Sequence, residues 1–142
     1  MTVLACKAVR IDHLRREPET RGKPDMNYEG RVFRSVANSE AGDVGQETTF
    51  HYRQEGQVVW AIYSGGSVLY GTLLAKADSA GNLDMRYQHL TRDGGFKTGR
   101  CQSRPELLPD GRLRLHEHWE WTSGAEGAGV SIVEEIAGSR RS

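Results

Sequence analysis

Turn signals recur along this chain at nearly regular intervals. Between Tyr28 and Ile136, runs of about eight to eleven residues alternate apolar and polar side chains, and short segments rich in Gly, Asp and Asn separate them. Alternation of this kind predicts half-buried β-strands, and the short connections predict antiparallel hairpins. Because no helical period interrupts the pattern, we expect an all-β protein.

The alternating runs predict eight strands, over residues 29–36, 48–54, 57–63, 68–76, 83–90, 96–103, 112–121 and 130–136. A meander of eight strands can close on itself, which removes both exposed sheet edges. We therefore predict an eight-stranded antiparallel up-and-down barrel of the calycin/lipocalin-like kind, with a flattened sandwich as the alternative. A closed barrel has an interior, so the function is expected to depend on what that interior holds.

The chain divides into a patterned region and two short flanks. Residues 1–25 mix charges of both signs with Pro18, Gly22 and Pro24, which prevent a long helix. We predict a flexible or weakly helical N-terminal extension over 1–25, the barrel over 26–137 and a polar tail over 138–142.

Composition narrows the classes of partner. Lys plus Arg and Asp plus Glu number 19 each, so the formal net charge is zero. This balance offers no electrostatic footprint for nucleic acid or an anionic membrane. The mean hydropathy of −0.63 argues against a membrane-spanning helix. The cysteines, Cys6 and Cys101, fit a reducing compartment better than a disulfide framework, so we expect a cytoplasmic protein.

A carboxylate lies within an apolar stripe of the strand predicted over 112–121. Glu117 alternates in phase with Leu113, Leu115, Trp119 and Trp121. If this face points inward, the carboxylate needs a cation, several hydrogen-bond donors or a proton. Glu117 is therefore a candidate polar anchor for a ligand.

The last predicted strand repeats this feature, because Glu134 alternates in phase with Ile132 and Ile136. Closure of the meander would pair the first strand with the last and bring Arg34 opposite Glu134. Two interpretations stay open, a structural ion pair at the seam and a polar anchor inside a ligand cavity.

The strand predicted over 83–90 carries the densest polar cluster of the chain, which includes Arg86, Tyr87 and His89. Tyr52 and Tyr63 add phenols that need hydrogen-bond partners when buried. Such groups suit a compact polar or aromatic ligand, and they also suit an ordinary filled core. The candidate ligand-binding residues are Arg34, Tyr52, Tyr63, Arg86, Tyr87, His89, Glu117, Trp119, Trp121 and Glu134.

A metal site and a phosphate-binding loop are both disfavoured. His116 and His118 share one strand face with Glu120, but Arg112 and Arg114 lie on the same face and would repel a divalent cation. The segment 94–98 lacks the adjacent Gly and Lys of a phosphate-binding loop, and no serine lies in a nucleophile elbow. We expect neither a metal nor a cofactor.

Three classes of function remain. The first is a non-catalytic barrel that binds a small molecule. The second is an enzyme in which Glu117 or Glu134 works beside His89 as acid and base. The third is a filled barrel that acts through a protein partner or as a homodimer.

Several motifs carry a resemblance to a known family, namely 27–35, Tyr63–Gly66, Met85–His89, Gly99–Cys101, Leu108–Arg112 and Trp119–Gly124. Over about residues 26–136 the chain resembles small bacterial proteins of no established activity, some of which carry the automatic label N-acetylglutamate synthase. That label implies an acetyl-coenzyme A enzyme, whose Arg/Gln-x-x-Gly-x-Gly/Ala turn opens a helix. The chain has neither the motif nor a helix after it, so no catalytic residue is carried over.

Overall fold

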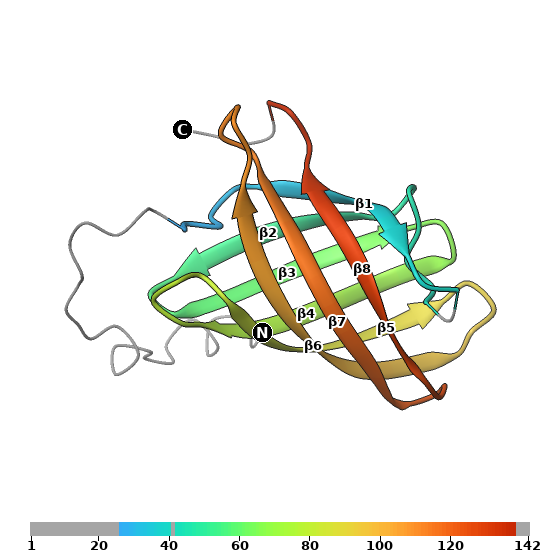
Figure 1. The fold of residues 1–142 in the computed structure, drawn as a ribbon. Helices are drawn as coiled ribbons and strands as arrows, with labels where there is room; N and C mark the ends of the chain where they lie inside the picture. Colours follow the sequence, from blue (N-terminus) through green and yellow to red (C-terminus); the bar gives the residue numbers. More distant parts are fainter. Residues whose placement is uncertain (1–25, 41, 139–142) are drawn as a thin grey trace, which may run out of the picture.

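The computed structural model describes residues 26–40 and 42–138, and within them the chain forms a closed antiparallel barrel (Figure 1). Its eight strands follow chain order: β1 Val32–Asn38, β2 Thr49–Glu55, β3 Val58–Gly65, β4 Val68–Ala77, β5 Leu83–Thr91, β6 Phe96–Leu107, β7 Leu113–Ser123 and β8 Ala128–Glu135. The predicted all-β barrel is confirmed. Cys6 and the N-terminal extension predicted over 1–25 lie outside the described residues, as does most of the predicted tail. The described residues form no helix that could cross a membrane.

The barrel closes where β1 pairs with β8, and Figure 1 shows β1 lying between β2 and β8. In this seam Arg34 is in register with Glu134, as predicted. The register shifts between Ser35 and Ala37 because a bulge interrupts β1. A bulge bends its strand and strengthens the local twist, which helps a sheet to curve shut.

Local chemistry moves some strand boundaries from their predicted places. β1 begins at Val32 because a turn precedes it, with Gly30 at a φ of 79° that glycine adopts readily. β6 continues through Pro105 to Leu107. Pro105 lies beyond Ser103, the last β6 residue in register with β5, so its missing N–H leaves no gap in that pairing.

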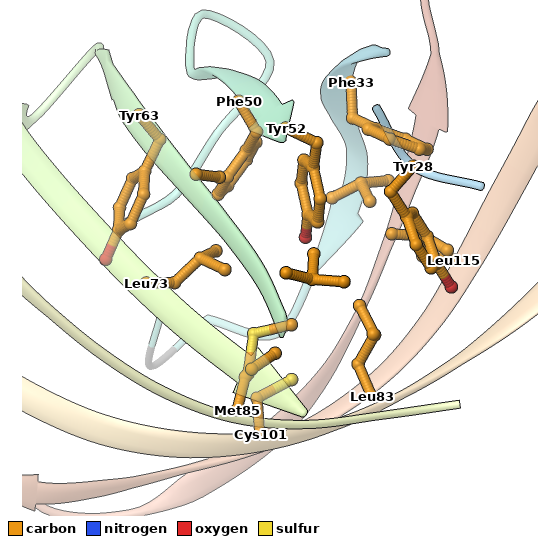
Figure 2. Packing of buried hydrophobic residues seen from close by; sticks show 14 of the residues in the cluster. Tyr28, Phe33, Phe50, Tyr52, Tyr63, Leu73, Leu83, Met85, Cys101 and Leu115 are labelled. Carbon is orange, nitrogen blue, oxygen red and sulfur yellow. The ribbon is translucent and has the colours of Figure 1, made fainter. Parts of the chain in front are cut away.

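The end of the barrel that contains Tyr28 is filled by packed side chains. The Tyr28 hydroxyl donates a hydrogen bond of 2.6 Å to the carbonyl of Gly81, which fixes the ring across this end. Tyr52 packs between Tyr28 and Phe33, with ring centroids 5.7 and 4.9 Å away. Figure 2 shows these rings and Leu83 pointing into the same interior. In this half of the barrel, Tyr28 and Tyr52 are therefore part of the packed hydrophobic core.

Candidate functional site

The opposite half of the barrel contains a cavity of about 60 Å³. Its walls come from the end of β1, the segment that follows it, the start of β2, the end of β3 and the middle of the later strands. Most of the lining is aromatic or aliphatic, and a few polar groups interrupt it. The lining residues are Asn38, Gly42, Asp43, Val44, Phe50, Tyr63, Leu73, Met85, Tyr87, His89, Cys101, Glu117, Trp119, Trp121 and Ser131.

Cross-strand glycines position the large rings of this wall. Each of these rings lies over a glycine that is its register partner on the next strand, and a Cβ on that glycine would collide with the ring. An aromatic side chain that covers a cross-strand glycine compensates for the surface that the glycine leaves unpacked. The pairs are Tyr63 with Gly71, Tyr87 with Gly99, and Trp119 with Gly129.

Trp121 is the centre of the aromatic wall. Its ring centroid lies 5.8 Å from that of Tyr87, 5.7 Å from that of His89 and 5.6 Å from that of Trp119. These separations are typical of edge-to-face and tilted aromatic packing. The Trp119 indole N–H donates a hydrogen bond of 3.0 Å to Asn38 Oδ1, so its polar edge is satisfied. These contacts fix the positions of the two indole rings in the wall.

Glu117 places its carboxyl group in the cavity wall. The Ser131 hydroxyl on β8 donates a hydrogen bond of 3.0 Å to Glu117 Oε1. Burial raises the pKa of Glu117 from 4.5 to about 7, although Ser131 and the neighbouring Ser103 both favour the ionised form. Near neutral pH this carboxyl can therefore either accept or donate a proton.

A second polar cluster fastens Asp43, in the segment between β1 and β2, to the barrel. His89 Nε2 donates to Asp43 Oδ2 at 3.0 Å, and Tyr63 OH is hydrogen-bonded to His89 Nδ1 at 2.9 Å. Lys97 Nζ lies 2.9 Å from the same Asp43 oxygen. Burial acts to raise the pKa of Asp43, but the bonds from His89 and Lys97 outweigh it and lower that pKa. These contacts hold Asp43 ionised against the cavity.

The structure separates the predicted site residues into three groups. Tyr63, Tyr87, His89, Glu117, Trp119 and Trp121 line the cavity together. Tyr52 points inward but belongs to the packed half, between Tyr28 and Phe33.

Arg34, Arg86 and Glu134, also candidate ligand-binding residues, lie on the outer face, so the structure does not place them in the cavity lining. The Arg86 guanidinium binds Asp84 at 2.8 Å. Glu134 accepts a bond of 2.7 Å from Arg114, so it belongs to an ion pair on the outside of the barrel. Alternation explains all three placements, because Ser35, Tyr87 and Glu135 next to them point inward.

Sequence reasoning missed the polar residues Asn38, Asp43 and Ser131 of the cavity lining. The connection between β1 and β2 is long for a hairpin of this meander, and that length was the available signal for Asn38 and Asp43. Ser131 was hidden because the alternate face of β8, with Val130 and Ile132, is the more apolar one.

The phenol and the thiol of the cavity lining are held in their protonated forms. Burial raises the pKa values of the Tyr63 phenol and of the Cys101 thiol well above their ordinary range, so both stay protonated. His116, from the His-x-His pair, lies on the outside and binds Glu106 at 2.8 Å. Within residues 26–40 and 42–138, no three or more His, Cys, Asp or Glu side chains converge as a metal site would require.

A closed β-barrel with one end packed and a cavity at the other defines a small-molecule-binding barrel as the class of protein. The model of a family described as avidin-like protein matches residues 26–136, and the chain belongs to this family. The match covers the stretch on which the sequence resemblance rests, whereas no comparison supports the N-acetylglutamate synthase label. No curated protein matches the chain.

Proposed function

We propose that this chain binds a compact polar or aromatic molecule in the cavity lined by Tyr63, Tyr87, Glu117 and Trp121. The observation that carries the proposal is the contrast between the two halves of the barrel. One half is filled by packed side chains, whereas the other keeps a cavity whose apolar walls hold the half-buried carboxyl of Glu117. Ligand sites typically combine apolar walls with a few fixed polar groups. The avidin-like family binds small molecules such as biotin, which supports the same role here.

The wall residues divide the work of binding. Trp119, Trp121 and Tyr87 would cover the apolar faces of the molecule. Glu117 and Ser131 would fix a polar group at the side of the cavity. Asp43, held by His89 and Lys97, would close the side formed by the segment after β1. A ligand held this way is buried without any covalent step.

Native mass spectrometry of the purified protein, followed by thermal-shift screening with a metabolite panel that includes biotin, tests the proposal. We expect a bound mass that is lost on denaturation, or a ligand that raises the melting temperature. Replacing Trp121→Leu should weaken binding of that ligand at least tenfold, because a central aromatic contact is lost. The matched variant Trp60→Leu removes an indole from the outer face, against Arg53, and should leave affinity unchanged. A bare chain with no stabilising ligand contradicts the proposal.

We infer in addition that the chain forms a homodimer through the outer face of β3 and β4. Ile62, Tyr70 and Leu74 are 45%, 53% and 59% exposed on these adjacent strands. A cluster of large exposed apolar side chains often marks an association surface. Members of the avidin-like family often form oligomers, which supports self-association here.

Sedimentation velocity at micromolar concentration measures this association. The wild-type chain should sediment as a dimer, and Leu74→Lys should convert it to a monomer, because it places a charge in the apolar contact. Leu107→Lys is the control, since Leu107 is similarly exposed, at 57%, but lies at the end of β6. A wild-type chain that stays monomeric would disprove the dimer.

The cytoplasmic location also stays a proposal. It is supported by the free thiol of Cys101, which lies buried in the cavity wall. Proteins that keep reduced cysteines are typical of reducing compartments.

A further inference from the structure

We propose that the molecule held in the cavity presents a small organic cation, such as a guanidinium or amidinium group, to the carboxyl of Glu117. This inference rests on the proposed binding function and names the chemistry of its ligand. It starts from a charge that the described part of the barrel leaves unmatched.

Glu117 has no cationic partner among residues 26–40 and 42–138. The neighbour that hydrogen-bonds its carboxyl is the neutral Ser131 hydroxyl, at 3.0 Å. The basic groups close to the barrel interior are committed elsewhere. Arg31 pairs with Glu135 at 2.6 Å, and Lys97 pairs with Asp43 at 2.9 Å.

This arrangement differs from that of Glu135, whose side chain is 4% exposed. Glu135 has a guanidinium partner and also accepts a bond of 3.0 Å from the Leu113 backbone N–H. Glu117 has hydroxyl neighbours only, so its ionised form is poorly compensated, and burial raises its pKa to about 7. A bound cation would supply the missing charge in the same way that Arg31 does for Glu135.

The walls beside Glu117 suit a cation as well. Tyr87, Trp119 and Trp121 surround the cavity with electron-rich rings, which attract an organic cation within about 6 Å of the ring centroid. Trp121 already has such a contact within the chain, because Lys97 Nζ lies 5.3 Å from its ring centroid. The charge of Lys97 is matched by Asp43, so it adds little repulsion at the cavity.

The size of the cavity limits the group that can enter. A volume of about 60 Å³ holds roughly four to six water-sized atoms, at about 10–15 Å³ for each. A guanidinium group has four heavy atoms and five N–H donors in one plane. It therefore fits the space, while the rest of the ligand would lie toward Asn38 and Val44. A metal ion is a poorer candidate, because no cluster of three ligating side chains exists within the described ranges.

The titratable groups that face Glu117 are few, and most stay neutral. Burial raises the pKa values of all the phenols and of the thiol around it, which are Tyr28, Tyr52, Tyr63, Tyr87 and Cys101. The remaining charged or titratable groups near the cavity are His89, Asp43 and Lys97, and both His89 and Lys97 bind Asp43. The ionisation of Glu117 should therefore dominate the pH dependence of cation binding.

Benzylguanidine and benzylurea test this inference by calorimetry, since their head groups are isosteric and differ in charge. The guanidinium stays charged at pH 6 and pH 8. We expect benzylguanidine to bind at least tenfold more tightly than benzylurea at pH 8. Its affinity should fall about tenfold at pH 6, because only about a tenth of Glu117 is then ionised if its pKa is about 7.

Glu117→Gln should abolish both the preference and its pH dependence. Glu120→Gln is the matched control, because Glu120 lies on the same strand, faces outward and pairs with Arg100. Two results would overturn the inference: tighter binding of benzylurea than of benzylguanidine, or an affinity for benzylguanidine that Glu117→Gln does not change. Either result would still support the proposal that the barrel binds a small molecule. If neither probe binds, the inference fails, and if the metabolite panel also gives no ligand, the proposed function fails with it.

Discussion

Replacing Arg31→Met should lower the free energy of unfolding by about 3–5 kcal/mol, the typical loss when one partner of a buried ion pair is removed. Arg31 and Glu135 are each only 4% exposed, and Arg31 Nη1 lies 2.6 Å from Glu135 Oε1. The guanidinium also donates to the carbonyl of Asn27 at 2.7 Å. Met fills much of the same volume but leaves the Glu135 charge without its cation at the packed end of the barrel. Urea denaturation monitored by tryptophan fluorescence measures the loss.

Two controls separate an unpaired charge from general damage. The double variant Arg31→Met/Glu135→Leu removes both charges and should recover most of the loss, because replacing a whole buried pair is often nearly neutral. Arg53→Met breaks the Arg53–Glu29 pair, whose side chains are 58% and 43% exposed, and should cost no more than about 1 kcal/mol. If Arg31→Met were as mild as Arg53→Met, the buried pair would not stabilise the seam between β1 and β8.

The barrel was predictable because every strand of a closed meander obeys the same two rules. Alternation places every second residue inside, and a turn must follow each run, so the pattern survives without knowledge of tertiary contacts. The predicted strands differ from the observed ones at their ends, because single local contacts determine where a strand starts or stops. The turn at Gly30 and the unpaired side of Pro105 are examples.

The same alternation could have improved the predicted site. Arg86 and Tyr87 are neighbours on one strand, so they cannot both line the interior, and the inward position of Tyr87 excludes Arg86. For β8 the choice of face could not be made from hydrophobicity. Its inner face carries Ser131, which binds Glu117 on the neighbouring strand β7, and Glu135, which binds Arg31. Arg31 lies 104 residues from Glu135 in the sequence, so only closure of the barrel brings that pair together.

Glu117→Gln should raise stability at alkaline pH, by about 3 kcal/mol at pH 8. Its carboxyl has a pKa of about 7 in the folded chain and an ordinary value of 4.5 when exposed. Below pH 4.5 both states are protonated, and the carboxyl has no effect. Between 4.5 and 7 the unfolded chain loses its proton first, so folding stability falls as the pH rises. Above pH 7 the loss is complete, at about 1.4 kcal/mol for each unit between the two pKa values.

Urea denaturation of the wild type and of Glu117→Gln at pH 4.5 and pH 8 measures the effect. The expected result is the change with pH in the difference between their free energies of unfolding. Any other group that titrates in this range is common to both proteins, so its contribution cancels. Glu120→Gln, on the outer face of β7, should track the wild type at both pH values. A gap between Glu117→Gln and the wild type that does not change with pH would show that Glu117 ionises as easily inside the barrel as in water.

The stability lost through Glu117 also links the fold to the site. An ionised Glu117 lowers the free energy of unfolding at neutral pH, and a cation bound beside it would offset that loss. Saturating benzylguanidine at pH 8 should therefore stabilise the wild-type chain more than Glu117→Gln, by about 1.4 kcal/mol for each tenfold difference in affinity. That outcome would show that the Glu117 carboxyl lowers the free energy of unfolding of the free protein and strengthens ligand binding. Such a trade-off between stability and function is common at functional sites.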